Sequence, residues 1–266
     1  MSDPSITARY HAAQEIARRA GGDALRYFAA YDTLEIDQKG HQDLVSEGDR
    51  NVELLVRREL EEAFPEDAIV GEEHAPKSGS SGFTWVIDPI DGTANFVRGI
   101  PAWTVVLACT KGPDTVIGVI HDPVHDELYH CARGGGAFRN DAPIAVTPDA
   151  SITQGSVGVG FSARTSTGGI MRLMQGILEE GGVFYRNASG ALSLAYVACG
   201  KLLGFSEEHM NAWDCLAGQL LVAEAGGCVE DQDANAMIDE GGRVVAAAPG
   251  IWPDLLRISE SAFAAD

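Results

Sequence analysis

The chain has 266 residues, of which 45% are apolar or aromatic and 22% are charged. This length and composition predict one large domain or two tightly joined halves with a sizeable core, and they argue against a disordered chain. The formal net charge of −20, from 19 basic and 39 acidic residues, disfavours nucleic-acid polymers and membranes as partners.

The cysteines and the first residues of the chain bear on its compartment. Five cysteines lie scattered among apolar or small residues, and none has CxxC spacing. We interpret them as buried free thiols, which predicts a reducing compartment and a cytoplasmic location. The start, MSDPSITARYHAAQ, lacks the basic and apolar segments of a secretory signal, and no apolar run of about 18 residues predicts a membrane span.

The first quarter of the chain predicts two helices and a short strand. Apolar residues at helical spacing predict a helix over residues 6–29, with an interruption at Gly21-Gly22. Alternation over 34–38 predicts a short strand. Ser46 is the expected N-cap of a second helix, which Pro65 helps to end.

The next segment is rich in strand signals. Residues 68–70 predict a short strand that runs into the sequence GEEH, and residues 85–87 predict a buried strand. Further strands are expected over 105–110, 115–121 and 127–131, with turn signals between them. Clustered strands with short links predict an antiparallel sheet.

Strands and helices alternate in the rest of the chain. The pattern predicts strands over 155–161, 183–185, 202–205 and 244–248, and helices over 170–178, 191–198, 212–225 and 252–263. Such alternation is typical of α/β folds. We therefore predict an α+β half over residues 1–143 and an α/β half over residues 144–266, joined as one compact unit.

The sequence TWVIDPIDGTANF, residues 84–96, places two carboxylates at the end of a buried strand. Pro89 is expected to stop the strand ladder, so that Asp88 lies at the strand end and Asp91 one turn later. Gly92-Thr93 is expected to begin a short helix whose backbone N–H groups form an anion site. Taken alone, two acids in DxxD spacing are more often a turn and a helix cap.

Three other acids lie in comparable positions. Glu72 follows the predicted strand over 68–70, Asp214 lies in the first turn of an apolar helix, and Asp49 precedes the apolar face of the second helix. Each also has an ordinary structural interpretation, as a solvated glutamate or as a helix first-turn acid.

Convergence of these acids requires cations. Two like charges about 4 Å apart repel by about 4 kcal/mol at an effective dielectric constant of about 20. Oxygen ligands without a cluster of His or Cys favour Mg²⁺ over zinc. His121 and His125 are spaced i,i+4, but a proline lies between them and no third zinc ligand is evident.

Three motifs together resemble a known family. GEE at 71–73, DPIDGTANF at 88–96 and WDCLAGQLLVAEAGG at 213–227 resemble the inositol monophosphatase family of Mg²⁺-dependent, Li⁺-sensitive phosphatases. The resemblance implies a five-layered α/β/α/β/α sandwich that forms a homodimer. It also implies a phosphoric monoester hydrolase that binds two or three Mg²⁺ ions and acts on a small polyol or sugar phosphate, first of all inositol monophosphate.

The resemblance carries over to individual residues. It implies that the metals are held by Glu72, Asp88, the carbonyl of Ile90, Asp91 and Asp214. Thr93, with Glu72, is expected to orient the attacking water. Asp49 lies where the family carries an acid tied to a third, weaker metal site, and Lys39 lies near a basic position that precedes this segment.

The expected substrate contacts are Asp91, the backbone N–H groups of Gly92 and Thr93, Ser189, and Glu207. Ser189 matches a hydroxyl residue of the family, although the segment 188–190 is one residue shorter than the family pattern. Glu207, seven residues before Asp214, matches an acid that binds a substrate hydroxyl. The altered segment leaves the sugar specificity open.

Several alternatives remain at this level. Relatives in the superfamily act on phosphoadenosine phosphate, fructose bisphosphate or histidinol phosphate, whereas NFVRGIP at 95–101 resembles the inositol branch. No signature of a covalent nucleophile is evident, which favours direct attack by water. A non-catalytic Mg²⁺-binding regulatory protein is the alternative of another class, and the presence of both Glu72 and Thr93 disfavours it.

Overall fold

A computed structural model describes residues 3–40, 43–148, 150–162 and 164–264, without the side chains of residues 38–40 and 43. The predicted role of Lys39 therefore lies outside the described residues. The α-helices are α1 (Pro4–Phe28), α2 (Glu47–Ala63), α3 (Thr93–Phe96), α4 (Thr167–Glu179), α5 (Gly190–Ala198), α6 (Ala212–Glu224), α7 (Ala234–Glu240) and α8 (Trp252–Phe263). Two 3₁₀ turns span Tyr31–Thr33 and Ile152–Gln154.

The strands form three sheets. In chain order they are β1 (Ile36–Gly40), β2 (Asp43–Ser46), β3 (Ala68–Gly71), β4 (Phe83–Asp91), β5 (Thr104–Lys111), β6 (Asp114–Asp122), β7 (Glu127–Ala132), β8 (Ala137–Arg139), β9 (Ala142–Pro143), β10 (Ser156–Val159), β11 (Val183–Tyr185), β12 (Gly204–Met210), β13 (Cys228–Val229) and β14 (Gly242–Ala247). A seven-stranded sheet has the order β3-β4-β5-β6-β7-β8-β9, and a five-stranded sheet has the order β11-β10-β12-β14-β13. The β1-β2 hairpin forms the third sheet.

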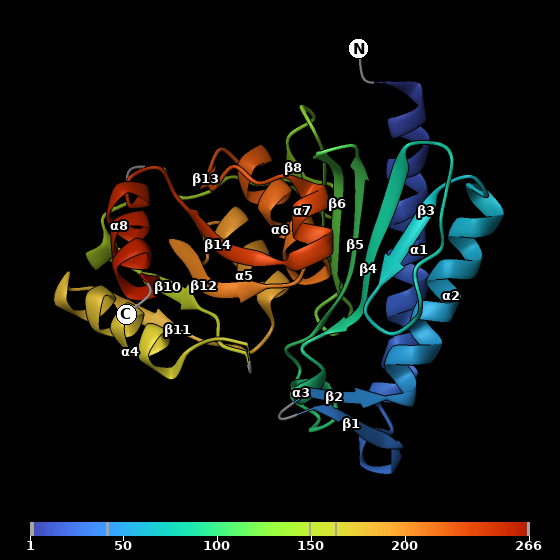
Figure 1. The fold of residues 1–266 in the computed structure, drawn as a ribbon, viewed down its shortest axis with the longest axis horizontal. Coiled ribbons are helices and arrows are strands. Elements are labelled where there is room, and N and C mark those ends of the chain that lie inside the picture. Colours follow the sequence, from blue (N-terminus) through green and yellow to red (C-terminus); the bar gives the residue numbers. More distant parts are fainter. Residues whose placement is uncertain (1–2, 41–42, 149, 163, 265–266) are drawn as a thin grey trace.

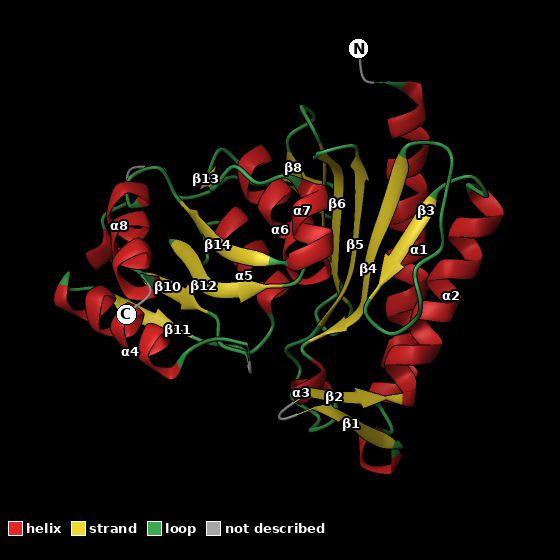
Figure 2. Cartoon of the chain, viewed as in Figure 1, coloured by secondary structure: helices red, strands yellow, loops and turns green. Residues whose placement is uncertain are grey.

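The two large sheets and their helices form five layers (Figure 1). Helices α1 and α2 cover the outer face of the seven-stranded sheet, and α4 and α8 cover the outer face of the five-stranded sheet (Figure 2). Helices α5 and α6 lie between the sheets and are buried against both. This arrangement confirms the predicted five-layered α/β/α/β/α sandwich, which combines α+β and α/β elements.

Strand directions differ between the two large sheets. In the first sheet each neighbouring pair from β4-β5 to β8-β9 is antiparallel, whereas the pair β3-β4 is parallel. In the second sheet β10 is parallel to β11 and β12, whereas β14 is antiparallel to β12 and β13. The first sheet ends at Pro143, and the division of the chain into halves after this residue stays a prediction.

The predicted interruption of the first helix is wrong. Helix α1 continues through Gly21-Gly22 to Phe28. A Cβ atom on Gly21 would overlap the ring of His121, whose Nδ1 lies 3.0 Å from the carbonyl oxygen of Ala17. The glycine therefore allows close packing of the helix on the sheet, and it does not end the helix.

Two strand boundaries also differ from the predictions. Strand β4 does not stop at Pro89: the ladder is irregular between Asp88 and Asp91, and Asp91 pairs again with Thr104 of β5. The strand predicted over 202–205 corresponds to β12, which begins later, at Gly204, and continues to Met210. Strands β2, β8, β9 and β13 and helix α7 were not predicted, because such short elements show too little apolar periodicity.

The described cysteines agree with their interpretation as free thiols. Cys109, Cys131 and Cys215 are buried, and Cys199 and Cys228 are partly buried. Within the described ranges, every helix is too short or too polar to cross a membrane.

Glycines allow the middle layer to pack closely. A Cβ on Gly118 of β6 would lie 2.6 Å from the carbonyl oxygen of Ala217 in α6. A Cβ on Gly218 of α6 would lie 2.5 Å from the Cβ of Leu194 in α5. The contacted atoms belong to the backbone or to a side-chain Cβ, so they cannot move aside unless a helix shifts.

Gly118→Ala is expected to lower the free energy of unfolding by about 1–3 kcal/mol, since the added methyl overpacks the contact between β6 and α6. Gly22→Ala is the matched control, because a Cβ at Gly22 of α1 meets nothing within 4 Å. In a helix that change should stabilise the chain by about 0.5–1 kcal/mol. Urea unfolding of both variants measures the difference, and equal effects would refute the packing argument.

Candidate active site

Three carboxylates meet at one end of the seven-stranded sheet. Asp88 and Asp91 come from β4, and Asp214 comes from the first turn of α6. One oxygen from each lies within 4.8 Å of the others, with Asp88 and Asp91 buried and Asp214 partly exposed. The structure thus brings together two motifs that lie far apart in the sequence.

The local backbone explains the position of the two β4 acids. Between Asp88 and Asp91 the ladder is irregular, and the Asp88 carboxylate accepts a hydrogen bond of 2.9 Å from the Ile90 N–H. Gly92 follows with a φ of +97° and begins α3, the short helix that the sequence predicts. A Cβ at this position would lie 2.9 Å from the Ala102 carbonyl oxygen, so only glycine fits the turn.

Burial and mutual repulsion favour the protonated forms of these acids. Burial raises the pKa of Asp88 well above its ordinary value, and the charges of Glu72, Asp214 and Asp91 raise it further. The pKa of Asp91 is raised to about 7, first by burial and then by Asp214. Burial also raises the pKa of Asp214, which accepts a hydrogen bond from the Asp88 carboxyl.

This set of donors fits a hard divalent cation. All of the acids supply oxygen atoms, and their ionised forms together are stable only with positive charge among them. Each pair of charges about 4 Å apart repels by about 4 kcal/mol at an effective dielectric constant of about 20, so a bound cation would stabilise the ionised cluster. The acidic cluster could therefore hold a metal ion.

Glu72 lies beside this cluster, at the end of β3. Its backbone N–H donates to the carbonyl oxygen of Ile87 in β4 over 3.3 Å. It lines the same cavity as Asp91 and Asp214, and its charge is the second largest cause of the raised Asp88 pKa. The two neighbouring parallel strands thus place their acids at the same end of the sheet.

Thr93 is held by Asp49. The Thr93 hydroxyl lies 3.0 Å from an Asp49 carboxylate oxygen and 3.0 Å from the Ile90 carbonyl oxygen. Asp49 is fully buried, and its other oxygen accepts hydrogen bonds from the backbone N–H and the hydroxyl of Ser46. Burial raises the pKa of Asp49, and these hydrogen bonds lower it in part.

The bond between Asp49 and Thr93 was not predicted from the sequence. Ser46 and Asp49 form a capping box at the start of α2, which is the structural interpretation that the sequence already allowed. The capping box leaves one carboxylate oxygen of Asp49 for a further partner, and the sequence does not show that Thr93 is that partner.

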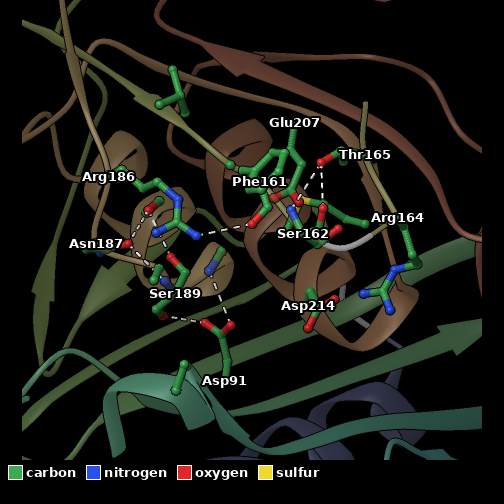
Figure 3. A pocket seen from close by; sticks show the side chains of 18 of the residues that line it. Asp91, Phe161, Ser162, Arg164, Thr165, Arg186, Asn187, Ser189, Glu207 and Asp214 are labelled. Carbon is green, nitrogen blue, oxygen red and sulfur yellow. Dashed lines mark hydrogen bonds between the residues drawn. The ribbon is translucent and has the colours of Figure 1, made fainter. Parts of the chain in front are cut away.

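Asp91 is bound to the start of helix α5. Its carboxylate accepts hydrogen bonds from the Ser189 hydroxyl, from the Ala191 N–H at 2.9 Å and from the Gly190 N–H at 3.2 Å (Figure 3). Ser189, predicted to bind substrate, is therefore buried as the N-cap of α5. Ala188, in the shortened segment, has a φ of +62°.

A cavity of about 660 Å³ opens in front of these groups. Its lining includes Glu72, Asp91, Gly92, Thr93, Phe161, Ser162, Arg164, Arg186, Asn187, Ser189, Glu207 and Asp214. Figure 3 shows Glu207 and Asp91 on opposite sides of this space, with Arg164 and Arg186 at its margins. The strand predicted over 155–161 is β10, which ends at Val159, so Phe161 lies in the following loop. The sequence patterns did not indicate that Phe161, Ser162 or Arg164 line the cavity.

Glu207 reaches the cavity from β12. Burial raises the pKa of Glu207 to about 8, with a further contribution from Asp214, while Arg164 and Arg186 lower it. A Cβ atom on Gly160 would overlap the Glu207 carboxylate. Glycine at this position therefore gives the acid its space beside the cavity.

Comparisons with known proteins agree with this fold and these motifs. The family model described as "Inositol monophosphatase family" matches residues 6–262. The chain is 37% identical over 246 residues to an inositol-1-monophosphatase of Mesorhizobium japonicum, with 91% of this chain and 92% of that protein covered. It is 34% identical over 244 residues to the Nus factor SuhB of Haemophilus influenzae, with 90% and 91% covered.

A solved structure shows the same fold. The extragenic suppressor protein SuhB from Bartonella henselae superimposes with a TM-score of 0.88 and 31% identity, covering 94% of this chain and 97% of that chain. The fold and the site define a protein of the phosphatase type with an acidic cluster that could hold a cation. The chain belongs to the inositol monophosphatase family.

The raised pKa values predict a pH-dependent effect of Mg²⁺ on stability. An Asp91 pKa of about 7 in the folded chain, against 3.8 ordinarily, means that ionising the group destabilises the fold as pH rises. A bound cation should offset this destabilisation. We therefore expect Mg²⁺ to raise the unfolding temperature more at about pH 8 than at about pH 5.5, where protons compete with it.

Calorimetric melting with excess Mg²⁺ or with a chelator measures this difference. Asp214→Asn removes one negative charge from the cluster and should reduce the rise in unfolding temperature that Mg²⁺ causes at about pH 8. An equal Mg²⁺ effect at both pH values would contradict the assignment of a cation to the cluster.

Proposed function

We propose that this chain is a Mg²⁺-dependent phosphomonoesterase that hydrolyses a small polyol or sugar phosphate, first of all inositol monophosphate. The observation that carries the proposal is the convergence of Asp88, Asp91 and Asp214 beside a cavity that Glu72 and Thr93 also line. Membership of the inositol monophosphatase family supports the reaction class.

The proposed metal ligands are Glu72, Asp88, the carbonyl oxygen of Ile90, Asp91 and Asp214, for two or three Mg²⁺ ions. When bound, Mg²⁺ supplies positive charge for the phosphate and the leaving oxygen, and it lowers the pKa of a bound water. The acidic protein can in this way accept an anionic substrate despite its net charge of −20.

The protein's own groups orient the reacting atoms. The Thr93 hydroxyl directs its proton toward Asp49 or the Ile90 carbonyl, which leaves an oxygen lone pair to accept a hydrogen bond from the attacking water. Glu72, which lines the same cavity, is the proposed second acceptor for that water. The backbone N–H groups of Gly92 and Thr93, at the start of α3, are the proposed hydrogen-bond donors to the substrate phosphate.

The far side of the cavity is the proposed site for the alcohol part of the substrate. A volume of about 660 Å³ accommodates a six-membered polyol ring with its phosphate. The Glu207 carboxyl group is the proposed partner of a ring hydroxyl. Ser189 acts in this proposal through Asp91, because its hydroxyl binds that carboxylate.

Other substrates and a second class of function remain as alternatives. Phosphoadenosine phosphate, fructose bisphosphate and histidinol phosphate are the other candidate substrates. A non-catalytic Mg²⁺-binding regulatory protein is the alternative of another class, and proteins named Nus factor SuhB are among the relatives. The homodimer and the cytoplasmic location stay predictions.

Asp91→Asn is expected to keep the fold and to lower kcat/KM for inositol 1-phosphate by about 10³-fold or more. The variant keeps one acceptor oxygen for the α5 N–H groups, but it loses the second acceptor and the charge that the proposed metals need. Asp239→Asn, an exposed site on α7, is the matched control. Phosphate release with saturating Mg²⁺, together with a melting curve, is the measurement, and near-normal turnover in Asp91→Asn would sink the assignment.

A substrate panel separates the alternatives. Phosphate release is measured with and without Mg²⁺ from inositol phosphates, glycerol phosphate, histidinol phosphate, fructose bisphosphate and phosphoadenosine phosphate. We expect Mg²⁺-dependent release, with the highest kcat/KM for an inositol monophosphate. Absence of release from the whole panel would favour the non-catalytic alternative.

A further inference from the structure

Helix α2 carries a buried stripe of charged side chains. Asp49, Glu53 and Arg57 are spaced four residues apart and therefore lie on one face of the helix. Asp49 and Glu53 are fully buried, and Arg57 is only 8% exposed. Buried charges are costly unless they are well paired, so this stripe requires a reason in the structure.

Glu53 binds the backbone that follows Glu72. One carboxylate oxygen of Glu53 accepts the Glu73 N–H at 2.7 Å, and the other accepts the His74 N–H at 3.2 Å. Arg57 donates its Nε–H to the Glu53 carboxylate over 2.6 Å. Its guanidinium also donates to the carbonyl oxygens of His74, at 3.0 Å, and Ala75, at 3.1 Å.

The residue before Glu72 is adapted to the same carboxylate. A Cβ on Gly71 would lie 2.5 Å from the Glu53 carboxyl carbon. Gly71 pairs with Ile87 in the β3-β4 ladder, and the Glu72 N–H donates to the Ile87 carbonyl oxygen. The sheet therefore fixes the backbone on one side of Glu72, and Glu53 fixes it on the other.

The stripe serves both of the proposed water-orienting residues. Asp49, one turn before Glu53, holds the Thr93 hydroxyl. Stability alone is a weak explanation for a buried ion pair, because apolar residues of similar volume are often as stabilising. Fixing two side chains at the edge of one cavity is a function that apolar residues could not serve, since they cannot bind backbone N–H groups.

We propose that Glu53, braced by Arg57, is a positioning residue that directs Glu72 into the acidic cluster. The inference rests on the proposed function, in which Glu72 holds Mg²⁺. Loosening the segment after Glu72 should weaken Mg²⁺ binding and slow the reaction, and it should leave the substrate KM at saturating Mg²⁺ nearly unchanged.

The test compares Glu53→Gln with Glu61→Gln, an exposed site on the same helix. Glu53→Gln keeps the side-chain shape but loses the charge and one acceptor for the N–H groups. Titration calorimetry with Mg²⁺ alone measures metal affinity, and phosphate release from inositol 1-phosphate at varied Mg²⁺ measures its kinetic consequence. We expect about tenfold weaker Mg²⁺ binding in Glu53→Gln, typical of lost outer-shell contacts, and wild-type affinity in Glu61→Gln.

Glu72→Gln separates failure of the positioning role from failure of the proposed function. Weaker Mg²⁺ binding in both Glu72→Gln and Glu53→Gln supports the proposal. Weaker binding in Glu72→Gln alone, with only a lower unfolding temperature in Glu53→Gln, overturns the positioning role and leaves the function intact. Wild-type affinity and turnover in Glu72→Gln overturn both.

Arg57→Lys keeps the inference testable if Glu53→Gln does not fold. Lysine retains the positive charge beside Glu53 but lacks the planar fork that reaches the two backbone carbonyls. We expect a smaller loss of Mg²⁺ affinity in the same direction. Unchanged affinity in a folded Arg57→Lys protein would overturn the role of the pair.

Discussion

Repulsion among carboxylates that are shielded from water is the constraint on which the rest of the site depends. Asp88 and Asp91 are buried on one strand, and Asp214 and Glu72 add charge from two other elements. The raised pKa of Asp91, about 7, expresses the free energy that its ionisation would cost. The chain has ionisable acids at these positions, where neutral side chains would avoid the repulsion. Such acids suit a site that is fully ionised when cations are bound.

Helix N-termini offset part of this charge. Asp91 accepts the first N–H groups of α5, and Asp214 is the capping-box acid of α6. Asp49 has the same capping role at the start of α2. The positive ends of three helices are thus directed at acids around one cavity. For Asp49 and Asp214, the helix-cap interpretation and the functional interpretation hold together and are not alternatives.

The layered fold brings these helix ends to one place because its layers pack closely. Gly118 and Gly218 remove side-chain bulk between β6, α6 and α5, so that α5 and α6 lie near the end of β4. Close to the cavity, Gly71, Gly92 and Gly160 likewise leave space for a carboxylate or a sharp turn. Glycine thus sets the distances in the core and at the candidate site.

The sequence by itself determined the resemblance to the family, because motifs at strand ends and helix starts are local and specific. The five layers and the candidate set of acids followed from that resemblance. Only the tertiary structure decided which partner each acid has. Asp49 meets Thr93 across 44 residues, and Asp91 meets Ser189 across 98. Local periodicity carries no information about contacts over such separations. The same limit explains why α1 continues past Gly21-Gly22: the ring of His121, from a distant strand, occupies the space that the glycine leaves.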